Sequence, residues 1–541
     1  MKIVLAFPCQ KRYINDPSMS ILPIGMLSLG AVLQEAGHEV QLIHLARFTV
    51  KDGIRLIQSE VPDLIGLSCF SFQRQRTLQL ADKLAEKADC PIVIGGPHAA
   101  PLANEILELH SSIKGVVIGE GERTFVELVN RLAQGKSPAH LAGLLWREGD
   151  EILLGEPVGL IEDLDDLPSV PAAELNIMGV EKLYQRRHLL ASRGCSARCI
   201  FCRAPEAWGR QVRRHSVARV LADVDVLRQK YGLLHVSFRD DTFSDDKEWT
   251  LKLCTGLKER KILWDCQSRV TALDYDLVKE MRSSGCVQVQ LGVESGSDKI
   301  LAYLKKPFNV TRALETISHC RQVGLAFSLY VIVGVPEESK GDLKATERLI
   351  RDARPASLSV SRLAHYPGTP LSEGLAAAEW FKDERESIFL RDDKAALTAE
   401  KRMRRLAEEV AQREPYTVEE LQEAGDLLDW PPLARLALAR LYCSLGFAEE
   451  SLDEYELLCK EEPDFLWAHL ECGDLLLEAG YTEDAKEHLL TVVEAVPNWP
   501  YALDRLGWTL CLLGEGQRGE ELKTKAAMLE PFVDPPPPPG Q

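Results

Sequence analysis

The sequence predicts an α/β protein built from three parts: a doubly wound N-terminal domain, a partial (β/α)6 barrel and a C-terminal all-α helical array. Three observations predict this class. Short strand patterns alternate with helical patterns over the first 150 residues, and a second such series with six strands follows. After about residue 380 the strand patterns stop, and small residues and glycines recur at a spacing of 34. A chain of 541 residues has room for roughly three or four packed units.

The first part, residues 1–150, contains five apolar runs of strand length. They cover residues 3–7, 40–45, 64–70, 92–96 and 116–119. Successive βα units imply a parallel sheet, and such sheets bind ligands beyond the carboxyl ends of their strands. Glycine-rich loops at 95–98 and 119–122 follow the fourth and fifth runs, and glycine allows the backbone to approach a large ligand closely. The alternative is that these glycines only form tight turns.

An acidic, proline-containing connector is predicted over residues 151–185, and the second part follows it over residues 186–375. Its six strand patterns cover residues 189–192, 235–239, 265–269, 287–294, 327–333 and 357–363. Helical patterns lie near 217–230, 247–259, 274–284, 311–323 and 342–353. Right-handed crossovers between six such strands predict a partial barrel, with its active site at the C-terminal ends of the strands.

The third part consists of a charged helical linker, residues 376–429, and a repeat array, residues 430–531. The residues spaced by 34 are Ala434, Ala468 and Ala502, and also Gly446, Gly480 and Gly514. Small residues where helices cross and glycine in the turn resemble tetratricopeptide repeats. Such an array binds a protein or peptide partner, docks on its neighbouring domain, or serves as a packing or dimerisation module. The proline-rich tail, residues 532–541, is expected to be disordered.

The composition disfavours several classes of protein. The 82 acidic and 64 basic residues give a net charge of −18, which repels phosphate backbones and disfavours a general nucleic-acid binder. No apolar stretch reaches the roughly 18 residues that a membrane span needs. The N-terminus lacks a signal-peptide pattern, and 14 cysteines in so long a chain do not suggest a disulfide scaffold. We therefore expect a cytoplasmic protein.

Three of the cysteines lie within eight residues. Cys195, Cys199 and Cys202 follow the first strand of the predicted barrel, on a loop where such barrels build their active sites. Three thiolates can hold three corners of a four-iron cluster and leave the fourth iron open for a ligand. The alternative is a structural zinc site, which needs a fourth ligand, and His188 is the nearest upstream candidate.

The CxxxCxxC spacing, with Phe201 before the last cysteine, resembles the signature of radical S-adenosylmethionine enzymes. Further motifs at strand ends resemble that family: FRDDTF at 238–243, GVES at 292–295 and IVGVPE at 332–337. The resemblance implies a [4Fe–4S] cluster on the three cysteines. It also implies contacts to S-adenosylmethionine from Phe201, Asp240, Asp241, Glu294, Ser295, Gly334 and Glu337. Seen alone, the acids among these residues would equally suit a helix cap or an exposed surface.

A doubly wound domain before such a barrel resembles the cobalamin-dependent subfamily of these enzymes, and the resemblance covers residues 1–370. It is carried by LPIGMLSLGAVLQEAGHEV, PDLIGLSCFSF, GGPHAAP and VIGEGE. The resemblance implies that strand-end loops cradle the corrin ring through Ser68, Gly95, Gly96, Pro97, His98, Gly119, Glu120 and Gly121. The sequence has no Asp-x-His-x-x-Gly motif, so we expect no axial histidine from that source.

Six arginines, at positions 193, 198, 203, 210, 213 and 214, surround the cysteine loop with one acid, Glu206, among them. This basic patch either holds an anionic group or is a solvated helix face.

The resemblance implies an enzyme that forms a 5′-deoxyadenosyl radical and methylates an unactivated carbon through methylcobalamin, with an electron donor such as a flavodoxin or ferredoxin. One alternative uses the same cofactors for radical cyclisation or rearrangement without methyl transfer. Another is a metal-stabilised scaffold protein that binds partners through its repeats. The substrate is not identified, because no residue that would contact it belongs to a motif.

Overall fold

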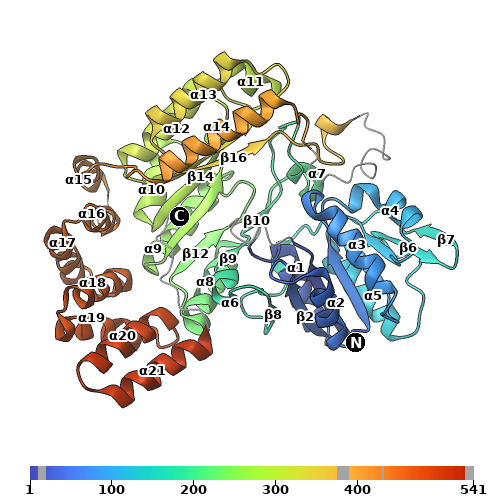
Figure 1. Ribbon diagram of the computed structural model, residues 1–541, viewed down its shortest axis with the longest axis horizontal. Coiled ribbons are helices and arrows are strands. Elements are labelled where there is room, and N and C mark those ends of the chain that lie inside the picture. The colour runs from blue at the N-terminus through green and yellow to red at the C-terminus, as the bar shows by residue number, and fades with distance from the viewer. Residues whose placement is uncertain (10–19, 374–388, 429–431, 531–541) are drawn as a thin grey trace. The chain divides into compact units, whose positions relative to one another are not determined.

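The computed structural model describes residues 1–9, 20–373, 389–428 and 432–530 (Figure 1). Its backbone contacts divide the chain into two compact units. The first comprises Met1–Arg186, Ser192–Ser216 and Leu363–Leu390, and the second comprises Arg187–Ala191, Val217–Arg362 and Arg391–Gln541. The loop with the three cysteines therefore belongs to the first unit, together with the N-terminal sheet. The tail that is expected to be disordered lies outside the described residues.

The first unit contains an eight-stranded sheet in the order β7-β6-β5-β4-β3-β1-β2-β8. Its five central strands are parallel: β1 (Lys2–Phe7), β2 (Glu39–His44), β3 (Leu64–Ser68), β4 (Ile92–Gly95) and β5 (Gly115–Val117). They coincide with the five runs expected from the sequence. The strand order reverses between β1 and β3, which is where sheets of this kind bind ligands.

Alternation along β1 explains why helices cover both faces of this sheet. Ile3, Leu5 and Phe7 pack with side chains of α1 and α5, whereas Val4 and Ala6 pack with side chains of α2, α3 and α4. The helices are α1 (Ile24–Glu35), α2 (Val50–Ser59), α3 (Arg74–Ala85), α4 (Ala103–Leu109) and α5 (Gly121–Ala133). A strand that is buried on both faces needs apolar residues at successive positions, as β1 has.

The predicted connector, residues 151–185, is more than a linker, because two of its segments join the sheet. β7 (Glu151–Leu154) forms an antiparallel hairpin with β6 (Leu144–Glu148) through a tight turn in which Gly149 has a φ of 61°. β8 (Asn176–Met178) pairs in parallel with β2. The connector interpretation missed β8 because a three-residue strand is too short to show a periodic pattern.

The second unit contains a six-stranded parallel sheet in sequential order. Its strands are β9 (His188–Leu189), β12 (His235–Phe238), β13 (Leu263–Ser268), β14 (Cys286–Glu294), β15 (Ala326–Val333) and β16 (Ser357–Arg362). Helices between the strands include α8 (Val217–Tyr231), α9 (Lys247–Glu259), α10 (Tyr275–Ser283), α12 (Val310–Gln322) and α13 (Lys340–Ala353). Each of these elements overlaps its expected range. Phe238, Trp264 and Phe327 are fully buried in the core of this sheet.

Residues 389–428, the described part of the expected charged helical linker, contain two helices: α14 (Lys394–Ala411) and α15 (Val418–Leu427). α14 packs against the edge strand β16, and its Met403 and Leu406 are buried. Arg362 of β16 forms ion pairs with Asp392 and, at 2.7 Å, with Glu400 of α14. The helix therefore shields an edge strand that would otherwise be open to pairing with another chain.

Six helices form three hairpins at the C-terminal end, drawn from orange-brown to red in Figure 1. They are α16 (Pro432–Ser444), α17 (Ala448–Glu461), α18 (Leu466–Ala479), α19 (Thr482–Ala495), α20 (Pro500–Leu512) and α21 (Gly516–Leu529). Each hairpin turn contains one glycine with a positive φ: Gly446 at 84°, Gly480 at 89° and Gly514 at 85°. The 34-residue spacing in the sequence is thus the spacing of successive hairpins.

The hairpins pack on the six-stranded sheet of the same unit. Nε1 of Trp467 donates to the carbonyl oxygen of Leu234 at 3.1 Å, and Lys261 pairs with Glu462 at 2.6 Å. Buried side chains of the sheet and of the hairpins form one continuous core. Docking on the neighbouring domain, one of the roles expected for the array, is therefore confirmed.

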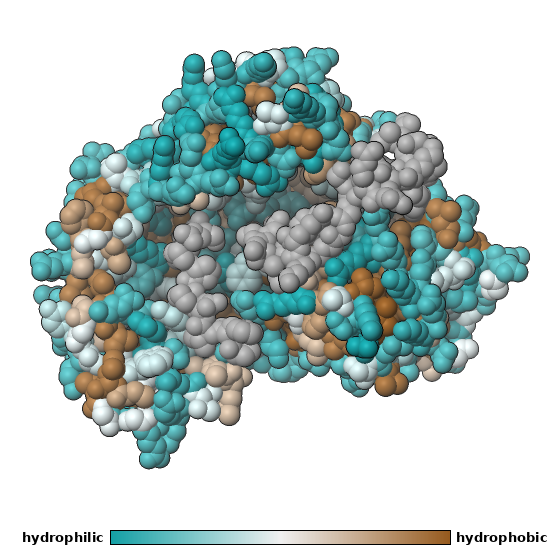
Figure 2. Space-filling model, in the orientation of Figure 1, coloured by the Kyte–Doolittle hydropathy of each residue, from teal (hydrophilic) through white to brown (hydrophobic). Residues whose placement is uncertain are grey.

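Hydrophobic patches are visible over the hairpins in Figure 2, and exposed side chains there include Phe447 and Tyr481. None of the helices in the described ranges is both long enough and apolar enough to cross a lipid bilayer.

Candidate functional site

A cavity lies at the carboxyl ends of β1, β3, β4 and β5 in the first unit. Seven of the eight residues that the sequence predicted for the corrin ring line it: Ser68, Gly95, Gly96, Pro97, Gly119, Glu120 and Gly121. Side chains of Leu5, Leu67, Val93 and Phe125 give the cavity an apolar floor. The predicted loops therefore meet around one largely apolar hollow at the point where the strand order reverses, as expected for a ligand site in such a sheet.

The backbone requires glycine at two positions of the rim. Gly96 has a φ of 105°, and a Cβ atom there would lie 2.9 Å from the carbonyl oxygen of Cys69. Gly119 has a φ of 80°. Residues with side chains rarely adopt these φ values, so the two glycines are needed to form the loops that border the cavity.

His98, the eighth predicted residue, is not among the residues that line the cavity. It is fully buried, and its Nδ1 lies 2.9 Å from Oγ of Ser71. Burial, helped by the nearby charges of Arg74 and Arg203, lowers the pKa of His98 to about 3, so the ring is neutral near pH 7. None of the described residues that line the cavity is a histidine. His98 therefore supports the 95–98 loop from behind.

Glu120 is part of a buried network of ion pairs. It accepts hydrogen bonds from Arg193 at 2.9 Å, from Arg213 at 2.8 Å and from the backbone N–H of Ile161 at 2.6 Å. Glu122 accepts a second bond from Arg193 at 2.6 Å. Burial alone would raise the pKa of Glu120, but the hydrogen bonds from Arg213 and Arg193 outweigh it and hold this pKa below its usual value. Two carboxylates thus balance two guanidinium groups inside the first unit.

This network changes the interpretation of the basic patch around the cysteine loop. Arg193 and Arg213 are neutralised by acids, and Arg210 pairs with Glu206 at 2.9 Å. The patch is therefore not a general anion-binding surface, because half of its six charges are already paired. The sequence concealed this, since Glu120 lies 73 residues before Arg193.

The three cysteines lie on the loop between β10 (Ser192–Arg193) and α7 (Ala204–Trp208). Cys195 and Cys199 are buried, Cys202 is half-buried, and all three are free of disulfide bonds. Three reduced thiols within eight residues suit an iron–sulfur cluster. His188, the candidate fourth ligand of a zinc site, has its Nε2 3.0 Å from the guanidinium of Arg239.

Hydrogen bonds hold this loop next to other segments of the first unit. The N–H of Leu371 donates to the carbonyl oxygen of Ile200 at 2.9 Å, beside the half-buried Phe201. Arg203, the residue after the last cysteine, donates from Nε to the carbonyl oxygen of Pro97 at 3.3 Å. The cysteine loop therefore contacts the glycine-rich loop that borders the cavity.

Trp208, at the end of α7, is a site residue that the sequence analysis missed. It lines the same cavity as the glycine-rich loops, and the guanidinium of Arg193 lies 5.0 Å from its ring centroid. In the sequence, the signal that could have pointed to Trp208 is its position six residues after the last cysteine of the loop. The cavity is therefore bounded both by the N-terminal sheet and by the helix that follows the cysteine loop.

Asp240 and Asp241 follow β12 in the second unit. Asp240 is fully buried, and its Oδ2 accepts a hydrogen bond from the N–H of Ala191 at 3.2 Å. Removal of water by surrounding protein atoms, and then the neighbouring Asp240 carboxylate, raise the pKa of Asp241 to about 7, although part of its surface stays exposed to solvent. An ammonium group placed beside this pair would offset both effects.

Glu294 ends β14, and Ser295 follows it. Glu294 has a φ of 67°, and its carboxylate lies 3.1 Å from Nζ of Lys306. Ser295 is buried, with its Oγ 3.2 Å from Oγ1 of Thr346. A non-glycine residue with a positive φ at a strand end is strained and is often functional. Lys306 is a partner of Glu294 that the sequence analysis did not single out.

Gly334 and Glu337 lie in the turn after β15. Gly334 has a φ of 73°, and its N–H donates to Oε2 of Glu338 at 2.8 Å. The side chain of Glu337 is 78% exposed, whereas Glu338 is half-buried, and burial raises the pKa of Glu338 to about 7. Of the two neighbouring acids, Glu338 is therefore the one whose carboxylate is held within the turn.

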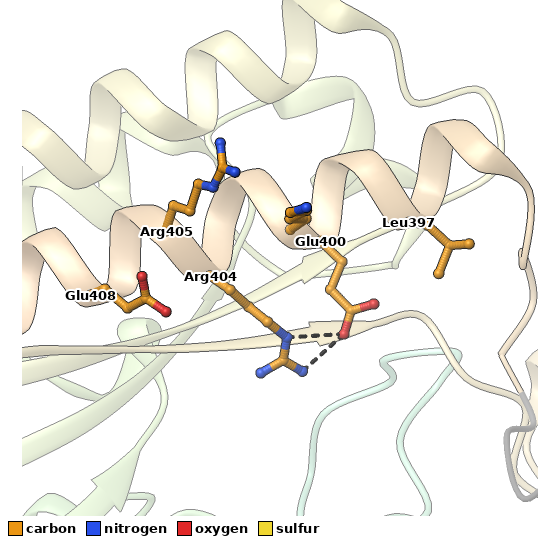
Figure 3. Close-up of a pocket in the computed structure, with 6 residues that line it drawn as sticks. Leu397, Glu400, Arg404, Arg405 and Glu408 are labelled. Carbon is orange, nitrogen blue, oxygen red and sulfur yellow. Dashed lines mark hydrogen bonds and ion pairs between the residues drawn. The ribbon is translucent and has the colours of Figure 1, made fainter.

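Another concave surface follows the exposed face of α14 and is shown in Figure 3. Its lining consists of Leu397, Glu400, Lys401, Arg404, Arg405 and Glu408. Glu400 and Arg404 are one turn apart and form an ion pair at 2.9 Å. Because all the lining side chains come from one helix, and the charges of Glu400 and Arg404 already pair there, this surface is a solvated helix face.

Comparison with known proteins matches both halves of the candidate site. The radical SAM superfamily matches residues 189–350, and the B12 binding domain matches residues 14–129. The chain carries a radical SAM domain and a B12-binding domain. It is therefore an enzyme whose cofactors are a [4Fe–4S] cluster, S-adenosylmethionine and cobalamin. The three cysteines and the three strand-end motifs lie inside the radical SAM match. Both glycine-rich loops lie completely inside the B12-binding match.

Two relatives match this chain over much of their own length. An uncharacterized methyltransferase of Pyrococcus horikoshii is 28% identical over 386 residues, which cover 69% of this chain and 83% of that protein. Cytidylyl-2-hydroxyethylphosphonate methyltransferase of Streptomyces wedmorensis is 26% identical over 452 residues, 72% of this chain and 84% of that protein.

A solved structure shows the same fold. It is the radical S-adenosylmethionine methyltransferase TsrM from Kitasatospora setae, with cobalamin and a [4Fe–4S] cluster bound. Its TM-score is 0.59 at 19% identity, and the match covers 68% of this chain and 76% of that one.

Proposed function

We propose that this radical SAM enzyme methylates an unactivated carbon atom of its substrate. The observation that carries the proposal is the cavity of the B12-binding domain, which Trp208 from the cysteine-loop segment helps to enclose. A corrin held there would lie beside the loop that holds the cluster. The two methyltransferase relatives support transfer of a methyl group.

The cavity residues bind and orient the corrin in this proposal. Gly96 and Gly119 keep the rim free of side chains, and the apolar floor shields one face of the ring from water. Ser68, Gly95, Pro97, Glu120 and Gly121 complete the cradle. His98, which is buried and has its Nδ1 2.9 Å from Oγ of Ser71, would support this loop from behind.

The cysteine loop and the strand ends hold the other two cofactors. Cys195, Cys199 and Cys202 would hold the [4Fe–4S] cluster through their thiolates. Asp240 and Asp241 accept from the ammonium group of S-adenosylmethionine, Glu294 and Ser295 bind its ribose and carboxylate, and Phe201, Gly334 and Glu337 surround the adenine. When bound, the cluster supplies the electron that cleaves S-adenosylmethionine, and cobalamin supplies the methyl group.

The remaining parts have supporting roles. We propose that the six-stranded sheet forms a partial barrel, with domain boundaries near residues 150, 186 and 376, and that the hairpins from residue 430 onward are tetratricopeptide repeats that bind a protein or peptide. An electron donor such as a flavodoxin or ferredoxin would reduce the cluster. The free cysteines suit a reducing cytoplasm.

The test uses the full chain, reconstituted without oxygen with iron, sulfide and cobalamin. Cys195→Ala, Cys199→Ala and Cys202→Ala should each abolish formation of 5′-deoxyadenosine, whereas Cys443→Ala, which removes an exposed cysteine of α16, should not. S-adenosylmethionine labelled in its methyl group should give labelled product. Formation of an unlabelled cyclised or rearranged product would favour the alternative without methyl transfer. Cysteine variants that all keep the parental rate would refute radical chemistry at this site.

A further inference from the structure

Four side chains of a kind that bind soft metal ions meet in the C-terminal hairpins. Cys459 lies on α17, His469 and Cys472 lie on α18, and His488 lies on α19. We propose that these four residues bind one zinc ion as a Cys2His2 site. The site belongs to the second unit and is built from helices that carry none of the proposed cofactor ligands, so it does not depend on the proposed function.

The helices bring the four side chains to one place. His469 and Cys472 are three residues apart on α18, so they lie on the same face of that helix. One ligand atom from each of Cys459, His469 and His488 lies within 4.8 Å of the others. Cys472 lies beside them, with its Sγ 3.7 Å from Nε2 of His488.

These separations are close to those of a zinc tetrahedron. Zn–S bonds of about 2.3 Å and Zn–N bonds of about 2.0–2.1 Å give ligand-to-ligand edges of roughly 3.3–3.8 Å. Nδ1 of His469 lies 3.1 Å from Nδ1 of His488, and Sγ of Cys472 lies 3.7 Å from Nε2 of His488. An imidazole gives one ion a single nitrogen, so only one of these two contacts would become an edge of the tetrahedron. Three of the four ligand atoms lie within 4.8 Å of one another, and the proposal requires the side chain of Cys472 to rotate toward them.

The surroundings of the four residues also favour a bound ion. Cys459 and Cys472 are buried, whereas both histidines are half-buried, which leaves a path for an ion to enter. Nε2 of His469 is buried and has no hydrogen-bond partner within the part of the chain that the structure describes. An unsatisfied polar atom beside two thiols is costly in a metal-free protein, and binding an ion offers compensation.

The positions 34 residues later provide an internal control, because they lie at equivalent places in the array and carry other residues. The positions 34 residues after Cys459, His469, Cys472 and His488 are Val493, Leu503, Leu506 and Leu522. Leu503 and Leu506 are fully buried there. Aliphatic packing is therefore sufficient to hold two hairpins together at this place. Across α17, α18 and α19 all four equivalent positions carry metal-binding residues instead, a coincidence that a coordinated ion explains.

A zinc ion here would have a structural role. Four protein ligands close the coordination sphere and leave no position for water or substrate. The ion would join α17, α18 and α19, and thereby fix the angle between one hairpin and the next in a region whose surface is exposed for partners.

The test measures metal in the full chain that carries Cys195→Ala, Cys199→Ala and Cys202→Ala, so that the cluster loop does not contribute. After purification under reducing conditions with zinc added, we expect about one zinc per chain by mass spectrometry of the metal. Cobalt in place of zinc should give the visible absorption of a tetrahedral thiolate site. His488→Ala and Cys472→Ala should each lower metal content at least tenfold at a fixed chelator concentration, whereas Cys511→Ser, on α20, should retain the full zinc content.

A fourfold variant guards against loss of folding. It carries Cys459→Val, His469→Leu, Cys472→Leu and His488→Leu, the residues found 34 positions later in the array. This variant should fold without metal, and chelator should lower the melting temperature of the parent but not that of the variant. No bound zinc in the parent would overturn the proposal, as would a Cys459–Cys472 disulfide, an iron–sulfur cluster at these residues, or equal loss of zinc in Cys511→Ser.

Discussion

Replacing Glu120 by glutamine is expected to destabilise the first unit, because it removes one of two negative charges that balance two buried arginines. The side chain of Glu120 is 1% exposed, and those of Arg193 and Arg213 are 5% and 7% exposed. After the substitution, Glu122 still contacts Arg193, but Arg213 loses its carboxylate partner. An arginine that cannot easily regain water would then be buried without a counter-charge.

The expected cost follows from that burial. Breaking a buried ion pair by removing one partner costs about 3–5 kcal/mol. At about 1.4 kcal/mol per factor of ten, opening of this region should become roughly two to three and a half powers of ten more frequent. Glu127→Gln is a matched control on the same helix, because the pair of Glu127 with Arg131 at 2.8 Å is partly exposed. Its loss should cost no more than about 0.5 kcal/mol.

Hydrogen exchange of the full chain without cofactors measures this opening locally, which is preferable because a chain with several packed parts need not unfold in one step. Peptides around residues 115–125 and 190–215 should exchange faster in Glu120→Gln and at the parental rate in Glu127→Gln. The pKa of Glu120 is lowered in the folded protein, so its stabilising effect is present above its unfolded pKa of about 4.5 and is lost as the pH falls. Equal exchange in the two variants at pH 7 would refute the reasoning.

Three further outcomes follow from other contacts. Gly96→Ala should weaken cobalamin binding in an absorbance titration by at least tenfold, because alanine at that φ costs about 1–3 kcal/mol and its Cβ clashes with a backbone oxygen. Gly37→Ala, at a φ of 84° with no atom within 4 Å of the added Cβ, should bind cobalamin normally. Equal losses of binding in the two variants would contradict the role of the rim. Because the pKa of Asp241 is about 7, its carboxylate becomes charged and should bind S-adenosylmethionine more tightly as the pH rises from about 6 to 8. Equilibrium dialysis should show an affinity that does not change with pH in Asp241→Asn. An affinity that does not change with pH in the parent would exclude this contact. Trp467→Phe removes the hydrogen bond to Leu234 and should destabilise docking of the hairpins by about 1–3 kcal/mol, seen as faster exchange in α18; unchanged exchange would mean that the bond contributes nothing.

Much of the fold could be predicted because it rests on local patterns. The five parallel strands of the first sheet and the six strands of the second are each short apolar runs between turn residues. The positions of their apolar residues predict which faces of the strands are buried. The turns of the three hairpins could be predicted from Gly446, Gly480 and Gly514, because glycine is favoured at the positive φ that each turn requires. β8 was missed, since its three residues pair with β2 only through the tertiary fold.

The candidate site was predicted less completely, because several of its contacts join residues far apart in the chain. The glycine-rich loops identify the cavity rim, but no local pattern reveals that Trp208 closes the same cavity. Likewise, Glu338 rather than Glu337 accepts from Gly334, a choice that depends on the backbone of one turn. Motifs therefore locate the loops of this site, whereas the orientation of individual side chains follows from packing.

The ion pairs at Glu120 have a consequence for how the two cofactor loops work together. Glu120 belongs to the B12-binding match and Arg193 lies two residues before the first cysteine, so the same buried hydrogen bonds position the rim of the cavity and the start of the cysteine loop. Arg203 repeats this link on the other side of the cysteines through Pro97. A loop held at both ends by the domain that binds the corrin has little freedom to change its distance from it. The methylation that we propose needs such fixed positions, because a methyl donor that drifts from the site of radical formation would leave a reactive intermediate without a partner.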